Sequence, residues 1–584
     1  MRKWFIGLAR YAIAVPILSC LAPGCTTSAQ QTAPPIPSDY ARIFPIVADH
    51  GMVVSEEATA SAIGVDILRR GGNAIDAAVA TGFALAVTLP RAGNLGGGGF
   101  MLVHLSHPEK NVAIDYRETA PADTQRDVFL DDKGNFVPAK SQASGLGVGV
   151  PGTVAGLALA EQKYGSGKFT LADLIAPAIA LARDGFPING ELADSLPKAA
   201  KRLALYPASR AIFLHTDGSA RGRGDRLDEH DLAATLQAIA DKGPDAFYKG
   251  DIAGEIAAAV DAAGGHMTLD DLASYRAVER APVEGTYRGH EIVSMPPPSS
   301  GGVHVIEILN ILEGFSLASL GQDSAAEIHD LAEAMKLAYA DRSKYLGDPD
   351  FYPIPIAALM SKAYADQLRA TIPADHARPS SDIGPGTLAP YESDQTTHFS
   401  VVDADGNAVS NTYTLNFSYG LGLVAAGTGV LLNNELDDFA AKTGVANAFG
   451  LTGSDANAPG PRKRPLSSMS PTMVFKDGTL ELVTGSPGGS EIINIVVQMI
   501  VDVIDFHMNI AEATEAVRVH HQWQPDVLRV ESGLSPDTMH LLEGMGYKIR
   551  VGQNMGSTET IARKNGHLTG FTDTRRLGTG AVGY

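Results

Sequence analysis

The feature that most constrains the fold of this 584-residue chain is an abrupt change of pattern between residues 395 and 396. Residues 378–395 are polar and rich in proline, glycine and serine, whereas residues 396–402 (TTHFSVV) are typical of a β-strand. Predicted helices and strands lie on both sides of this boundary. We therefore expect one globular unit that draws on both halves of the chain, and no domain boundary at residue 395.

The part before the boundary begins with two predicted helices. Ser55 is expected to cap the first helix, and Asn73 starts a second helix with apolar residues at helical spacing. The four glycines Gly96 to Gly99 then indicate either a backbone that another segment approaches closely or a flexible loop. Two strands follow, and residues 154–370 are mostly helical.

The part after the boundary contains two predicted β-hairpins. One joins residues 398–402 to 408–415, and the other joins residues 473–476 to 480–484. Residues 492–501 are apolar on nearly every side, so this helix should be buried. Hairpins flanked by helices predict an α+β fold of stacked layers.

The composition excludes some classes of partner and site. A formal net charge of −20 argues against nucleic acid and anionic membrane surfaces as partners. Both cysteines, Cys20 and Cys25, lie near the N-terminus, so the body of the protein has no disulfide framework and no cysteine metal site.

The N-terminus is typical of a secretory signal. Arg2 and Lys3 precede an apolar run, residues 4–22, and signal cleavage after Ala29 would leave a protein without a membrane span. A transmembrane anchor is the alternative, and Cys20 or Cys25 is a candidate lipidation site. We expect an exported protein, periplasmic or secreted.

Two other motifs carry less weight. The glycines of residues 147–152 match a dinucleotide-binding pattern, but no βαβ unit surrounds them and a turn into a helix explains them better. His520 and His521 are adjacent and would not share a face of a regular element, so packing or surface histidines are favoured over a ligand pair.

Thr396 is the residue on which a catalytic interpretation depends. A threonine hydroxyl needs a neighbouring base to act as a nucleophile. A threonine at a chain terminus carries its own base, because an α-amine has a pKa near ~8. Such an enzyme must first cut the bond before that threonine.

Several segments together resemble one known family, the gamma-glutamyltranspeptidases, which are autoprocessing N-terminal-nucleophile hydrolases. The matches span nearly the whole chain after the signal, in the order of the family. They are residues 115–118, 295–302, 396–402, 405–409, 412–416, 433–439, 464–471 and 485–489.

The resemblance implies a four-layer αββα sandwich built from both halves of a self-cleaved chain. Cleavage between Gln395 and Thr396 would give a large subunit, residues 30–395, and a small subunit, residues 396–584. Thr396 would attack the γ-glutamyl amide of glutathione or a related donor, and water or the amine of an amino acid or peptide would take the acyl group. Neither a metal nor an organic cofactor is expected.

The resemblance also implies roles for further residues. Thr414 corresponds to the threonine that hydrogen-bonds the nucleophile, and Gly488 and Gly489 correspond to the oxyanion hole, where backbone N–H groups meet a developing negative charge. Receptors for the two charges of the donor's α-amino acid end complete the site. The carboxylate would meet Arg117, Ser467 and Ser468, and the ammonium would meet Asn416, Glu435 and Asp438.

Two departures from the family and two alternatives remain. Glu435 stands where some bacterial members carry glutamine, and Phe449 stands where some have a tyrosine in the lid, residues 440–460. The alternatives are a related acylase, for glutaryl-β-lactams or poly-γ-glutamate, and an uncleaved, inactive binding protein. The ammonium receptors favour a γ-glutamyl donor over a glutaryl one.

Overall fold

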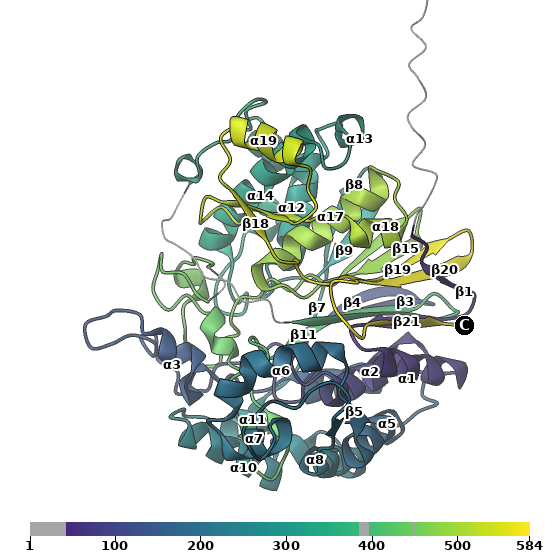
Figure 1. Cartoon of the computed structure of the whole chain (residues 1–584), viewed down its shortest axis with the longest axis vertical. Coiled ribbons are helices and arrows are strands. Elements are labelled where there is room, and N and C mark those ends of the chain that lie inside the picture. The colour runs from purple at the N-terminus through teal and green to yellow at the C-terminus, as the bar shows by residue number, and fades with distance from the viewer. Residues whose placement is uncertain (1–42, 385–395, 449) are drawn as a thin grey trace, which may run out of the picture. The chain divides into compact units, whose positions relative to one another are not determined.

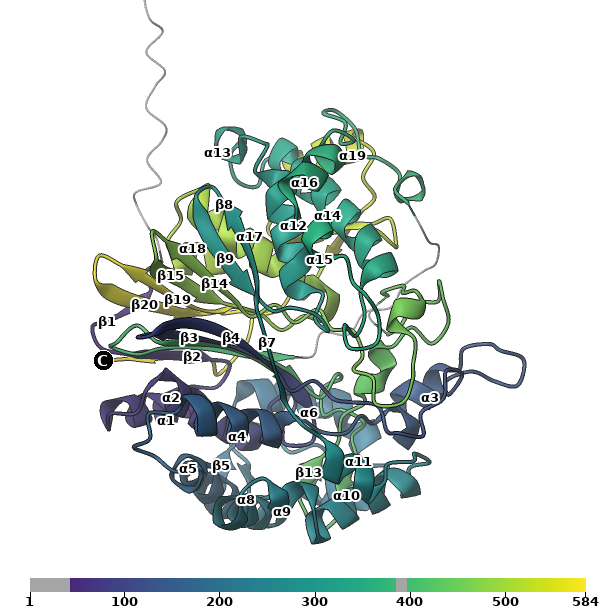
Figure 2. The ribbon, with the colours of Figure 1, turned by 180° about the vertical axis from the view of Figure 1, so that it is seen from behind.

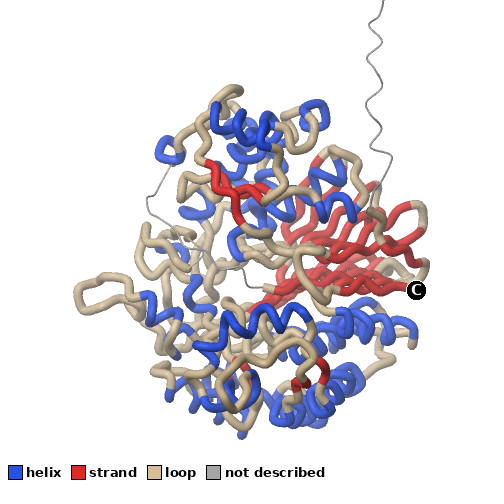
Figure 3. Tube along the Cα trace, in the orientation of Figure 1, coloured by secondary structure: helices blue, strands red, loops and turns tan. Residues whose placement is uncertain are grey.

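Two seven-stranded sheets lie face to face at the centre of the computed structural model, which describes residues 43–384, 396–448 and 450–584 (Figure 1). Helices cover the outer face of each sheet, so the layers follow the order helix, sheet, sheet, helix. Figure 3 shows the strands as a central block with helices on either side. This is the predicted four-layer α+β sandwich.

The first sheet has at its centre the hairpin predicted after residue 396. β10 (Thr397–Val402) and β11 (Ala408–Thr414) pair with each other, and on either side they pair with strands from the first part of the chain. The order in this sheet is β21 (Gly580–Gly583), β2 (Met52–Ser55), β10, β11, β3 (Gly98–Ser106), β4 (Glu109–Asp115) and β7 (Val278–Arg280).

The second sheet also mixes strands from both parts of the chain. The other predicted hairpin pairs with β9 on one side and with β19 on the other. The order is β1 (Ile46–Ala48), β20 (His567–Thr572), β19 (Glu559–Lys564), β15 (Thr479–Thr484), β14 (Thr472–Lys476), β9 (His290–Ser294) and β8 (Val283–Tyr287). Each of the two sheets therefore contains strands from before and from after residue 396.

One helical layer packs on the first sheet. α2 (Ala74–Thr88) is buried along its whole length, because it lies between this sheet and further helices. The helix starts after Asn73, in agreement with the predicted start, and the Asn73 side chain caps it by accepting hydrogen bonds from the backbone N–H groups of Ile75 and Asp76. The layer includes α1 (Ala58–Arg69), α4 (Thr153–Tyr164), α5 (Leu171–Asp184), α6 (Gly190–Leu203), α7 (Pro207–Phe213), α8 (His230–Lys242), α9 (Asp245–Tyr248), α10 (Asp251–Ala262) and α11 (Leu269–Ser274).

The predicted cap of the first helix is wrong by two residues. Ser55 is the last residue of β2, and Glu57 caps α1 by accepting a hydrogen bond from the N–H of Ala60 at 2.9 Å. The hydroxyl of Ser55 instead donates to the carbonyl of Glu57 at 2.8 Å. Serine is common both as a helix cap and in turns. Here Ser55 is paired within the sheet as the last residue of β2, so it cannot be the cap residue of α1.

The other helical layer packs on the second sheet, as the view from behind shows (Figure 2). Residues 492–501 are buried within α17, as their apolar character predicted. This side of the molecule holds α12 (Gly301–Leu312), α13 (Leu317–Leu320), α14 (Ala325–Tyr345), α15 (Ile356–Leu359), α16 (Lys362–Arg369), α17 (Ile492–Ile504), α18 (Ile510–Glu515) and α19 (Pro536–Gly544). Among the described residues, no helix is both long enough and apolar enough to cross a bilayer.

The four consecutive glycines lie where other backbone segments approach closely. A Cβ on Gly97 would lie 2.1 Å from the carbonyl oxygen of Thr414, and one on Gly99 would lie 2.4 Å from that of Thr412. The first of the two interpretations of this run is therefore correct. The glycines let β3 lie directly against the strand that ends beside the site.

We expect Gly99→Ala to lower the free energy of unfolding by about 2 kcal/mol or more, because a methyl group would overlap the neighbouring backbone. Thermal unfolding measures the change. Gly254→Ala in α10 is the matched control, since a Cβ there meets no atom within 4 Å and should stabilise the helix by up to about 1 kcal/mol. Equal unfolding temperatures for the two variants would contradict the close approach.

Candidate active site

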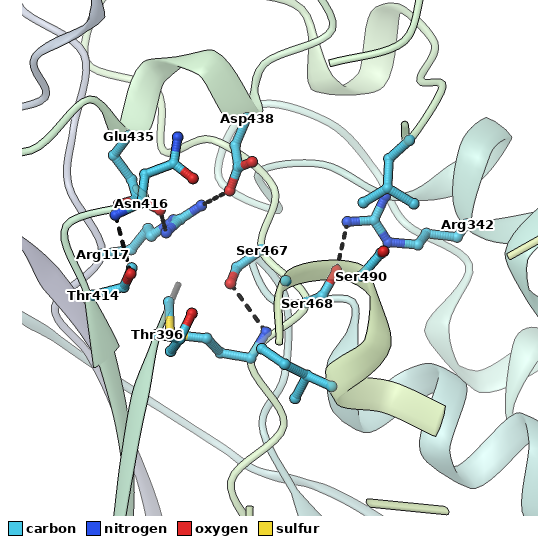
Figure 4. A pocket seen from close by; sticks show the side chains of 14 residues that line it. Arg117, Arg342, Thr396, Thr414, Asn416, Glu435, Asp438, Ser467, Ser468 and Ser490 are labelled. Atoms are coloured by element: carbon cyan, nitrogen blue, oxygen red, sulfur yellow. Dashed lines mark hydrogen bonds and ion pairs between the residues drawn. The ribbon is translucent and has the colours of Figure 1, made fainter. Parts of the chain in front are cut away.

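A pocket lies where β10 begins and β11 ends (Figure 4). All predicted site residues except Gly488 line it, although they come from distant parts of the sequence. The lining residues are Arg117, Arg342, Thr396, Thr414, Asn416, Glu435, Asp438, Leu451, Ser467, Ser468, Met469, Gly489, Ser490 and Ile492.

Thr396 lies at the floor of this pocket, directly before β10. The sheet pairs Thr397 with Tyr413, so the register continues with Thr396 beside Thr414. Thr396 is only 5% exposed, and what exposure it has is to the pocket. The hydroxyl of Thr414 accepts a hydrogen bond from the N–H of Asn416 at 3.0 Å. The backbone register thus places Thr396 and Thr414 side by side at one end of the sheet, and both line the pocket.

The two glycines of the predicted oxyanion hole begin the turn that leads into α17. Gly488 has φ 133° and Gly489 has φ 54°, both in the region that favours glycine. Gly489 lines the pocket, and Gly488 directly precedes it. A side chain at either position would strain this turn.

Arg117 is fully buried at the end of β4 and is bound by carboxylates. Its guanidinium pairs with Asp438 at 2.5 Å and with Glu435, and it lies 3.8 Å from Glu118. Burial alone would lower the pKa of Arg117, but Glu435 and Asp438 raise it overall. The predicted receptor for a carboxylate therefore pairs with two of the protein's own carboxylates.

This cluster contains more carboxylates than cations. Burial raises the pKa of Glu118 to about 7, although Arg117 opposes the shift, and burial likewise raises the pKa values of Glu435 and Asp438. Three carboxylates share one guanidinium, so the cluster favours an additional positive charge. A ligand ammonium would supply it.

Two residues that line the pocket each have one buried side-chain oxygen without a hydrogen-bond partner in the described part of the chain. These oxygens are Oδ1 of Asn416 and Oε2 of Glu435. The amide nitrogen of Asn416 donates to the carbonyl of Asn434 at 2.9 Å, and Asn416 has φ 73°, an uncommon value for a non-glycine residue. Buried acceptors without donors are costly, so both oxygens suit a ligand that brings donors.

Ser467 and Ser468 lie on the loop of residues 464–471. The hydroxyl of Ser467 accepts a hydrogen bond from the N–H of Met469 at 3.1 Å, and that of Ser468 accepts one from Arg342 at 3.0 Å. The carbonyl of Ser467 accepts hydrogen bonds from both the N–H and the hydroxyl of Ser300. The proline- and serine-rich turn at residues 295–302 thus holds this loop in place.

The sequence did not single out Arg342 or Ser490. Arg342 lies in an alanine-rich helix and Ser490 in the turn after the two glycines, and neither has a local pattern that marks it. Only the tertiary structure brings them to the pocket.

The remaining sequence motifs lie elsewhere. His520 and His521 are buried, and burial lowers the pKa of His520 to about 3, so it packs as a neutral ring beside Asn494. Residues 147–152 form the turn into α4 that we favoured. Phe449 lies outside the described residues, but the adjacent segment reaches the pocket, where Asn447 donates to Asp438 at 3.2 Å.

Comparisons with known proteins agree with the geometry. The family model described as gamma-glutamyltranspeptidase matches residues 60–583. The glutathione hydrolase proenzyme of Escherichia coli (strain K12) is 54% identical over 98% of both chains. The cephalosporin acylase structure from Bacillus halodurans has a TM-score of 0.81 at 29% identity, covering 95% of this chain and 98% of that one. The Helicobacter pylori gamma-glutamyltranspeptidase structure has a TM-score of 0.55 at 48% identity, covering 56% of this chain and 93% of that one.

The excess of carboxylates predicts that the pocket favours a ligand with an ammonium group, and L-glutamate is a suitable probe. Glu435→Gln removes one negative charge but keeps a carbonyl acceptor, so we expect the Kd for L-glutamate to rise about tenfold, the size of a lost charge-assisted hydrogen bond. Titration calorimetry or ligand-dependent thermal unfolding measures this change. Glu284→Gln, at an exposed position of β8, is the control. Equal affinities for all three proteins would contradict a role for this charge.

Proposed function

The chain belongs to the gamma-glutamyltranspeptidase family, and from that premise we propose how its own residues carry out the family's reaction. The family is self-cleaving, and this protein is a gamma-glutamyltransferase and glutathione hydrolase. We propose that the precursor cuts itself between Gln395 and Thr396. The products are then residues 30–395 and residues 396–584.

In this proposal, cleavage gives Thr396 both a nucleophile and a base. Its hydroxyl attacks the γ-carbonyl carbon of the donor, and its new α-amine takes the hydroxyl proton. The C–N bond of the donor breaks, the leaving amine takes up a proton, and the glutamyl group remains as an ester on Thr396. Water or an acceptor amine then attacks the ester and releases the threonine.

The surroundings of Thr396 support these steps. Thr414 lies beside it at the end of the paired strand, where its hydroxyl can orient that of Thr396. Gly488 and Gly489 begin the turn at the pocket wall, and their backbone N–H groups are the candidates for stabilising the oxyanion. Every group that the reaction needs comes from the chain, so we expect no metal or cofactor.

The observation that carries the choice of donor is the ion-pair cluster at Arg117. An α-amino acid end brings one carboxylate and one ammonium. The carboxylate of the donor would replace Asp438 and Glu435 as the ion-pair partner of Arg117. The ammonium of the donor would then pair with Asp438 and Glu435 and donate a hydrogen bond to the unpartnered oxygen of Asn416. Each buried charge keeps a partner through this exchange, so the head group of a γ-glutamyl donor enters at low electrostatic cost.

A related acylase is the second candidate, because the Bacillus halodurans structure is titled a cephalosporin acylase. A glutaryl donor has the carboxylate but lacks the ammonium. The carboxylate of a glutaryl donor would pair with Arg117 and so leave the buried carboxylates of Glu435 and Asp438 without a cation. The charge count therefore favours γ-glutamyl donors.

Acceptor, assembly and location are further parts of the proposal. We propose that amines of amino acids or peptides compete with water for the acyl enzyme. The two subunits should remain together, because each of the two large sheets contains strands from both of them. The N-terminal pattern of residues 1–29 supports export, with Cys20 or Cys25 as an optional lipid anchor, and these residues lie outside the described part of the chain.

The donor preference is testable with two anilides. We expect kcat/KM for γ-glutamyl anilide to exceed that for glutaryl anilide at least about a hundredfold, because an unpaired buried charge costs roughly 3–5 kcal/mol. Release of the aniline product measures both rates. Equal rates, or a preference for the glutaryl compound, would favour the acylase instead.

The nucleophile is testable by the fragments that form. We expect Thr396→Ala to remain one chain without activity, whereas the wild type gives two fragments, the small one beginning at residue 396. Denaturing electrophoresis and N-terminal sequencing check this result. Thr397→Ala is the matched control: its buried hydroxyl has no partner among the described residues, so this variant should still cut itself. An active wild type that never forms two fragments would overturn the mechanism.

A further inference from the structure

Arg342 is a second arginine of the pocket, on the last turn of α14. It is 4% exposed and lines the wall opposite Arg117, with Ser467 and Ser468 between the two (Figure 4). Arg342 has no role in the proposed reaction steps. Its environment nevertheless differs from that of Arg117 in a way that bears on the donor's carboxylate.

Hydroxyl groups, and no carboxylate, bind Arg342. Its Nε donates to the hydroxyl of Ser300 at 2.8 Å, and its Nη2 donates to that of Ser468 at 3.0 Å. Within the described ranges Arg342 forms no ion pair, whereas Arg117 has three carboxylates around it. Burial lowers the pKa of Arg342 to about 10, which still leaves it charged at neutral pH. Asp438 acts on this charge without forming an ion pair with it, so an anionic ligand close to Arg342 would stabilise the buried charge further.

The guanidinium also fixes the direction of the Ser468 hydroxyl. A guanidinium can only donate hydrogen bonds, so the oxygen of Ser468 must act as the acceptor. The proton of Ser468 is then left to donate elsewhere, and Ser468 lines the pocket. Ser300 differs, because its hydroxyl already donates to the carbonyl of Ser467 at 2.7 Å.

We propose that Arg342 is a positioning residue for the donor's α-carboxylate: it holds the hydroxyl of Ser468 so that this hydroxyl can donate its proton to the carboxylate. The inference rests on the proposed function, since it concerns the same donor. The two arginines then have different roles. Arg117 exchanges its internal carboxylates for that of the donor, whereas Arg342 acts through Ser468.

The test compares Arg342→Gln with the wild type on two donors, γ-glutamyl anilide and its α-carboxamide analogue. We expect the KM for γ-glutamyl anilide to rise about tenfold or more with kcat changed less than about threefold, the size of a lost charge-assisted contact. For the α-carboxamide, which has no carboxylate, the variant and the wild type should have the same KM. A merely structural role would raise the KM for both donors alike.

Further variants keep the inference testable if Arg342→Gln does not fold or cut itself. Arg342→Lys keeps the charge but loses the planar fork, and we expect a smaller rise in KM, confined to the donor with the carboxylate. Ser468→Ala should reproduce the effect of Arg342→Gln, and the double variant should be no worse than either single one. Arg183→Gln, at an exposed position, is the control.

The outcomes separate the two proposals. A wild type that cleaves γ-glutamyl anilide, together with an unchanged KM in the Arg342 variants, overturns this inference alone. Additive effects of the Arg342 and Ser468 substitutions would also overturn it. A wild type that cuts itself but releases no product from γ-glutamyl anilide overturns the proposed function, and this inference with it.

Discussion

The site depends on one buried guanidinium. Arg117 has no access to water, and its charge is tolerable only because Glu435 and Asp438 lie against it. Its Nε also donates to the carbonyl of Pro465 at 3.2 Å, and its own carbonyl accepts from the hydroxyl of Tyr275 at 2.8 Å. Arg117 therefore connects the end of β4 to the two loops that carry the proposed receptors, and it contributes to both the shape and the charge of the pocket.

The charged groups of the pocket suggest how it could recognise the carboxylate and the ammonium of an α-amino acid. Carboxylates predominate around Arg117, whereas the hydrogen-bond partners of Arg342 among the described residues are hydroxyl groups. The two regions thus differ in sign, and the serines of residues 464–471 lie between them (Figure 4). A zwitterion matches this arrangement, but a ligand with one charge leaves part of it uncompensated.

Much of the fold was predictable because local pattern and tertiary role agree. The hairpin after residue 396, the buried α17 and the Asn73 cap are each specified by a few neighbouring residues. Ser55 was misassigned as a cap because the sheet register, a long-range constraint, decided its place. The same limit applies to the site. Residues in loops with a distinctive sequence could be assigned to the pocket. The sequence around Arg342 is that of an ordinary surface helix, and only the packing of this helix places Arg342 beside Ser468.

Because each large sheet contains strands from both sides of residue 396, cleavage there changes how the molecule can refold. An uncut chain folds as one molecule, because β2, β3, β10 and β11 are connected before they pair. Once the peptide bond is broken, the same sheets could re-form after complete unfolding only if two separate polypeptides met. The mature enzyme would then persist through a slow rate of unfolding, and its precursor would hold the only unimolecular route to the native state.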